Sequence, residues 1–173
     1  MSQPSPLAAL QHQALALRAA GDVAGACRLL ADALNPLRAS YGEDHPDVLG
    51  SAHLLARLHR EADDPAAARR VLEEAIAAGE RRWNPSDPLM LAFSFDLASV
   101  AEELGNRHEA RRHYSRVASS GPAVLGVDHP AVQAARHYLG GAAVGTAQPV
   151  PPLPHESAMP LAPVSTPPRQ LPP

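Results

Sequence analysis

The 173-residue sequence lacks lysine and is poor in cysteine and aromatic residues. Cys27 is the only cysteine, so the chain can form no internal disulfide and no cysteine-based zinc site. One Trp, three Tyr and two Phe stand among many Ala and Leu residues, which are the strongest helix formers. These proportions predict an all-α fold. All fifteen basic residues are arginine, a usage typical of GC-rich and most often bacterial genomes.

Concentrated positive charge is also absent. The formal net charge is −3, and the arginines are scattered along the chain, which argues against a nucleic acid partner. No stretch reaches the roughly 18 uncharged apolar residues that a membrane span needs. The N-terminus MSQPSPLAAL lacks the basic and then apolar pattern of a signal peptide. We therefore expect a cytoplasmic protein that binds neither nucleic acid nor membrane.

Motifs for metal binding and catalysis are missing as well. Nine histidines are present, but none forms a His-x-x-x-His pair beside a carboxylate cluster. The sequence contains no Gly-rich phosphate loop, no nucleophile elbow and no supported Cys/His pairing. We expect no metal site, no cofactor and no enzymatic activity. The histidines that precede proline are expected to shape the loops before helices.

An internal repeat is the main positive feature of the sequence. Four dipeptides that end in proline stand 42 residues apart: Gln3-Pro4, His45-Pro46, Asp87-Pro88 and His129-Pro130. Proline is favoured in the first turn of a helix, so each dipeptide predicts a helix start. A turn signal follows about 16 residues later, as at Ala62-Asp63-Asp64, and a second apolar period follows the turn. Each period is therefore predicted to form a helical hairpin.

Small residues recur with the same period at two places in each hairpin. They are Ala14, Ala56 and Ala98 in the first helix and Ala26, Ala68 and Ala110 in the second. Alanine allows two helices to approach closely, and the larger Leu30, Leu72 and Tyr114 are expected to fill the space beside it. One hairpin cannot bury its apolar face alone, so the hairpins are predicted to stack.

The spacing of small and bulky residues resembles the tetratricopeptide repeat. The loop Tyr41-Gly42-Glu43-Asp44-His45-Pro46, echoed at 125–130, resembles the kinesin light chain subtype of that family. The resemblance implies a right-handed α-α superhelix of about three hairpins within residues 4–140. The expected repeats are 4–45, 46–87 and 88–129, and a capping helix is expected at 130–140.

The same resemblance implies a protein or peptide partner in a concave groove lined by the first helix of each hairpin. Projecting the repeat pattern onto this sequence gives eight candidate groove residues: Gln11, His53, Leu54, Arg57, Arg60, Phe95, Asp96 and Ser99. Leu54, Arg57 and Phe95 are the expected anchors. Members of the family that grip a peptide carboxylate use Lys and Asn in these columns, so that mode is not expected here. The competing interpretation is that Leu54 packs between hairpins and the others form a solvated surface.

Residues 142–173 contain ten prolines, no aromatic residue, and only two charged residues, Glu156 and Arg169. This composition predicts disorder with a polyproline II bias. Pro149–Pro154 is a candidate ligand for an aromatic groove, although an inert tail is the favoured interpretation. The leading functional hypothesis is a non-catalytic adaptor. The alternative is a self-associating structural or regulatory module, a weak homo-oligomer or one whose tail is the interacting element.

Overall fold

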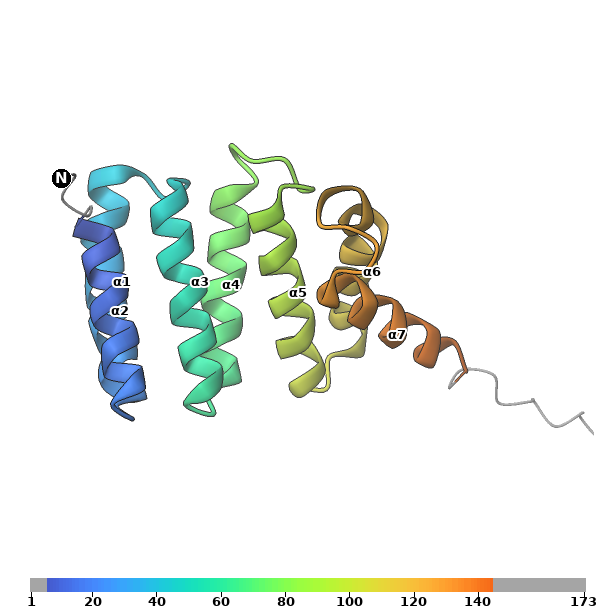
Figure 1. The fold of residues 1–173 in the computed structure, drawn as a ribbon, viewed down its shortest axis with the longest axis horizontal. Helices are drawn as coiled ribbons and strands as arrows, with labels where there is room; N and C mark the ends of the chain where they lie inside the picture. The colour runs from blue at the N-terminus through green and yellow to red at the C-terminus, as the bar shows by residue number, and fades with distance from the viewer. Residues whose placement is uncertain (1–5, 145–173) are drawn as a thin grey trace, which may run out of the picture.

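The computed structural model describes residues 6–144, with side chains to Gly141, and within them it is entirely helical. The helices are α1 (Pro6–Ala19), α2 (Val23–Tyr41), α3 (Pro46–Glu61), α4 (Pro65–Gly79), α5 (Pro88–Glu103), α6 (Arg107–Val124) and α7 (Pro130–Val144). Three antiparallel hairpins and a seventh helix stack side by side (Figure 1). The predicted all-α superhelical repeat fold is confirmed. Pro4 and most of the predicted Pro-rich tail lie outside the described residues.

The helices α3, α5 and α7 start at the predicted Pro46, Pro88 and Pro130, and a polar side chain caps each of these starts, whereas α1 begins at Pro6. Before α3, Nδ1 of His45 accepts a hydrogen bond from the backbone N–H of Asp47 at 3.2 Å. Before α5, the Asp87 carboxylate accepts one from Leu89 at 2.9 Å. Such caps satisfy backbone donors that the first helical turn leaves without partners. The loop histidines thus have the local role expected of them.

Tight turns join the two helices of each hairpin. Gly21 and Gly105 adopt positive φ values of 86° and 75° at equivalent places. The second repeat places Asp63 there with φ of 60°, the only non-glycine residue with positive φ in the described chain. This left-handed conformation is strained for a residue with a Cβ atom, although Asp tolerates it better than most.

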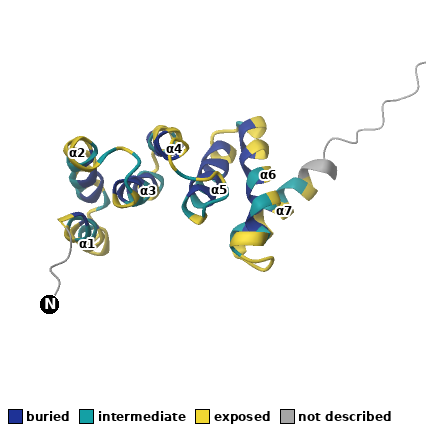
Figure 2. Cartoon of the chain, turned by 90° about the horizontal axis from the view of Figure 1, so that it is seen from above, coloured by how far each residue is buried: buried dark blue, intermediate teal, exposed yellow. Residues whose placement is uncertain are grey.

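The stack curves toward the odd-numbered helices. The backbones of α1 and α3, of α3 and α5, and of α5 and α7 approach closely, whereas those of α2 and α4 or α4 and α6 do not in the described part. Seen from above, α1, α3, α5 and α7 lie along one side and the even helices along the other (Figure 2). The odd helices therefore line the concave side, as the first helices of the hairpins were expected to do.

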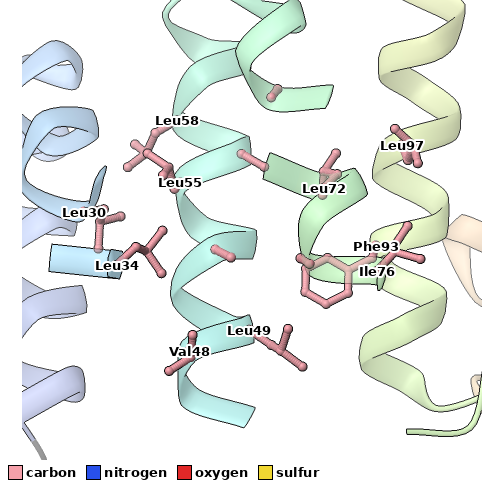
Figure 3. Close-up of a cluster of buried hydrophobic side chains, with 14 of the residues drawn as sticks. Leu30, Leu34, Val48, Leu49, Leu55, Leu58, Leu72, Ile76, Phe93 and Leu97 are labelled. Carbon is pink, nitrogen blue, oxygen red and sulfur yellow. The ribbon is translucent and has the colours of Figure 1, made fainter. Parts of the chain in front are cut away.

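The alanine columns lie inside the core. All six predicted alanines are fully buried, and Leu30 and Leu72 beside them are 0% exposed. Aliphatic side chains from α2, α3, α4 and α5 interdigitate in one continuous cluster (Figure 3). A second cluster joins α5, α6 and α7 and includes the buried Tyr114. Stacking thus buries apolar faces that single hairpins would expose.

Candidate partner-binding groove

One row of residues crosses the concave side at the repeat spacing. Leu15 on α1, Arg57 on α3 and Ser99 on α5 stand 42 residues apart. Leu15 is 40% exposed, which is unusual for a large apolar side chain in this molecule. Arg57 is exposed and makes no ion pair with any of the described residues. The first two repeats therefore expose an apolar and a cationic side chain on this side.

His53 and Asp96 do not face solvent independently, because they bind each other across α3 and α5. Nε2 of His53 lies 2.6 Å from Oδ2 of Asp96, and the two side chains are 22% and 15% exposed. The His53 ring also packs edge-on against the buried Phe93, with 5.1 Å between ring centroids. This pair fixes the two helices relative to each other beneath the groove surface.

Arg60 joins the same two helices further along through an ion pair with Glu103. One period earlier, Arg18 on α1 makes the equivalent pair with Glu61 on α3 at 2.7 Å. Exposed pairs of this kind contribute little to stability, but they do order both side chains. The repeated pair marks a regular stagger between neighbouring odd helices.

Gln11 also makes a contact between repeats. Its Nε2 donates a hydrogen bond to Oγ of the buried Ser51 at 3.0 Å. Four of the eight candidate residues, namely Gln11, His53, Arg60 and Asp96, thus connect adjacent odd helices. Each of them has a polar group that is already paired in the absence of a partner, while Nε of Arg60 is buried without a hydrogen-bond partner.

Leu54 and Phe95 lie at the edge of the core rather than wholly on its surface. Leu54 is partly buried and packs against the cluster around α3 and α4. Phe95 packs against the second cluster and meets Tyr114 edge-on, with 5.9 Å between centroids. Either side chain can offer only part of its surface to a partner.

Tyrosines at the C-terminal end of the groove were not among the predicted site residues. Tyr138 on α7 stands one period after Asp96 and is partly buried, 4.6 Å from the Tyr114 ring between centroids. The Tyr114 hydroxyl donates to Oε2 of Glu102 at 3.1 Å and lies 3.2 Å from Oγ of Ser99. Burial raises the pKa of Tyr114. Extending the groove columns by one more period into α7 would have identified Tyr138.

The described residues hold no group of three or more His, Cys, Asp or Glu side chains placed to bind a metal ion. Cys27 is buried, and burial raises the pKa of its thiol, with Asp64 and Glu61 adding to the effect. A thiol held protonated in this way is a poor nucleophile. Within residues 6–144, no helix combines the length and apolar character needed to cross a membrane.

Comparison with known proteins agrees with this geometry. Residues 6–81 match the family model described as "Tetratricopeptide repeat". Two solved structures show nearly identical TPR-like repeats from a Podosopora anserina protein named as a kinesin light chain, one of them a variant. They superpose with TM-scores of 0.71 and 0.70, at 27% identity in each case, over 82% of this chain and 67% of theirs. No curated protein matches the chain.

Sequence and structure thus converge on one kind of module. The matched hairpins are similar to tetratricopeptide repeats, and the similar solved structures are TPR-like repeats of a protein named as a kinesin light chain. Repeats of this kind generally bind proteins and are typically non-catalytic scaffolds. The chain has the fold of a tetratricopeptide repeat stack.

Proposed function

We propose that this chain is an adaptor that binds a peptide or protein segment on the concave side of α1, α3, α5 and α7. The observation that supports this best is that some residues on that side are paired between helices while others are exposed. Gln11, His53, Arg60 and Asp96 are paired between helices, whereas Leu15 and Arg57 face solvent without such partners. A surface ordered in advance costs a partner less entropy to bind.

Within the proposed site, the contact residues are Leu15, Leu54 and Arg57. Apolar side chains bury surface on association, and Arg can donate several hydrogen bonds in a fixed geometry. The other candidates, with Phe95 and Ser99, form the supporting wall. Three hairpins give a short groove, so we expect modest affinity unless two copies act together.

We also propose that α7 caps the stack, so that copies of the chain do not polymerise end to end. Gln133 and Arg136 on α7 are exposed. At the equivalent positions of α3, two periods earlier, Leu49 and Ala52 are buried, with 1% exposure each. A polar outer face is what a terminal repeat needs for solubility. This arrangement supports a cap at α7 and disfavours end-to-end self-association. We further propose that the protein acts in a bacterial cytoplasm, independently of nucleic acid and membrane, in line with its composition.

The proposal is tested by affinity capture from host lysate with matched baits. The site variant is Leu15→Asp/Arg57→Glu, and the control is Arg70→Glu, which repeats the charge reversal of Arg57→Glu at an exposed position of α4. Circular dichroism should show equal helicity for all baits. We expect a partner held by the native chain and the control and lost by the site variant.

A fourth bait, stopped after Val144, separates the groove from the tail. Loss of the partner from this bait, together with its retention by the site variant, would transfer the binding function to residues 145–173. Equal capture by all baits would contradict a concave binding site.

A further inference from the structure

The outer side of the stack carries a crevice that the groove proposal does not use. It lies between α2 and α4, over the start of α3, and has a volume of about 490 Å³. Its apolar floor is formed by Val48, Leu49 and Ala52 of α3 with Ala75 and Ala78 of α4. All five are less than 9% exposed, so the floor belongs to the core of the domain.

Two ion pairs frame the mouth of the crevice. Nη2 of Arg38 on α2 lies 3.2 Å from Oε2 of Glu74 on α4, and Arg81 pairs with Glu43 of the preceding loop. The two arginines and two glutamates cancel, so the rim has no net charge. Exposed pairs are weak, and their guanidinium groups can also donate to a carbonyl oxygen.

The equivalent seam between α4 and α6 contains bulkier side chains. One period later, Ser94 replaces Ala52, Val117 replaces Ala75, and the fully buried Met90 replaces Val48. Its bridging ion pair is reversed, with Arg116 of α6 lying 3.3 Å from Glu80. The crevice therefore arises from small side chains at one seam and is not a general property of the stack.

We propose that the crevice is a docking site for the chain's own segment 157–168, with Met159 and Leu161 as the inserted side chains. This segment contains no charged residue, which matches a rim without net charge over an apolar floor. It has three prolines among its first eleven residues and a fourth at its end. Backbone carbonyls in a Pro-rich strand have no internal partners, so they can accept hydrogen bonds from Arg38 and Arg81.

Chain length selects this segment over the earlier Pro149–Pro154. The crevice lies at least two odd-helix spacings from α7, about 8–10 Å each, and the C-terminal end of α7 runs away from α3 (Figure 1). It also lies at the opposite end of the helices from Val144, since the first turns of α3 line it; 16 residues of α3 span about 24 Å. An extended chain covers about 3.3–3.6 Å per residue. Leu153 follows Val144 too closely to cross this distance of roughly 30 Å with slack, whereas Leu161 crosses it readily.

Paramagnetic relaxation in the full-length chain tests the proposal. A nitroxide is attached through Ala158→Cys in a chain carrying Cys27→Ala, and amide signals are recorded with the label oxidised and reduced. We expect a stronger loss of signal intensity at Glu43, Glu74 and Arg81 around the crevice than at Leu15 or Arg57 in the groove. A stronger loss at the groove residues, or loss confined to α7, would overturn the proposal.

Matched variants locate the contact. Leu161→Asp should restore the crevice signals, while Leu153→Asp, the same change in a residue too near α7, should not. Ala75→Val, which copies Val117 of the next repeat, should also restore them by reducing the crevice volume. Crevice signals that stay broadened in Leu161→Asp would refute the assigned insertion. Because the crevice lies on the side opposite the groove, failure here leaves the adaptor proposal standing.

Discussion

The second and third repeats place different side chains on the same helical hairpin. In the second, Val71, Leu72 and Ala75 of α4 form an aliphatic face. In the third, His113, Tyr114 and Val117 of α6 occupy the same places and bring polar groups into the interior. The turn differs too, with Asp63 in one repeat and Gly105 in the other. The 42-residue period thus specifies the backbone of each hairpin and the approximate size of the side chain at each position. The polarity of those side chains differs from repeat to repeat.

The largest effect is expected where the second repeat is most tightly packed. Leu72 is 0% exposed, so Leu72→Ala should lower the free energy of unfolding by about 2–5 kcal/mol through lost burial and a cavity. At the equivalent position of the third repeat, Tyr114→Phe keeps the ring and removes only the hydroxyl contacts with Glu102 and Ser99. This change should cost about 1 kcal/mol of unfolding free energy. Urea unfolding measures both, and equal losses would contradict the packing comparison.

His113 should make stability depend on pH in a way that Val71 cannot. Burial, with Arg112 and Arg116 nearby, lowers the pKa of His113 to about 4 from 6.5. The unfolded chain therefore takes up a proton before the folded chain does. Because of this difference, the free energy of unfolding is highest above pH 6.5. It falls by about 3 kcal/mol in all as the pH drops toward 4. Urea unfolding at a series of pH values measures this loss.

The variant His113→Val copies the second repeat and should flatten that pH profile. It should also stabilise the protein by about 1–3 kcal/mol at pH 7, because Nδ1 of His113 is buried without a hydrogen-bond partner. Arg112 donates to its other ring nitrogen, 3.0 Å away, so the unpaired Nδ1 carries the proton. An unchanged pH profile in the variant would show that another group titrates.

The turn residues should give a smaller difference. Asp63→Gly removes the left-handed strain and should raise stability by about 1 kcal/mol. The converse change, Gly105→Asp, should cost a similar amount in the third repeat. Thermal unfolding compares the two, and a loss of stability in Asp63→Gly would mean that unfolded-state entropy outweighs the strain.

The smallest effect is expected at the crevice. Ala75→Val adds two methyl groups to a place with open volume, so the change in unfolding free energy should stay within about 1 kcal/mol. The reverse substitution, Val117→Ala, removes a fully buried side chain from the filled seam and should cost more. Similar effects at both seams would indicate that they are packed alike.

Much of the fold was predictable because the period repeats helix starts and close contacts. The proline dipeptides predicted where α3, α5 and α7 start, and the alanine columns predicted residues that are buried in the core. The groove was harder to predict, since residues were projected at a spacing of 42. The ion pairs between neighbouring odd helices instead join residues 43 apart, as in His53–Asp96 and Arg60–Glu103. Which groups satisfy one another depends on that spacing, which the sequence period does not contain.

The crevice was beyond sequence analysis for another physical reason. It depends on volume that Ala52, Ala75 and Ala78 leave unfilled, while the same residue type at Ala56 and Ala68 is closed over completely. Whether a small residue permits close packing or leaves a hollow is decided by the distance between helices. That distance follows from all neighbouring side chains together.

Binding at the concave side is most directly tested by photo-crosslinking in the living cell. A benzophenone amino acid replaces Arg57 in the groove in one strain and Arg70 on α4 in another, both exposed positions. The adaptor account predicts a crosslinked partner from position 57 and none from position 70. Crosslinks from position 70 with none from position 57 would contradict it.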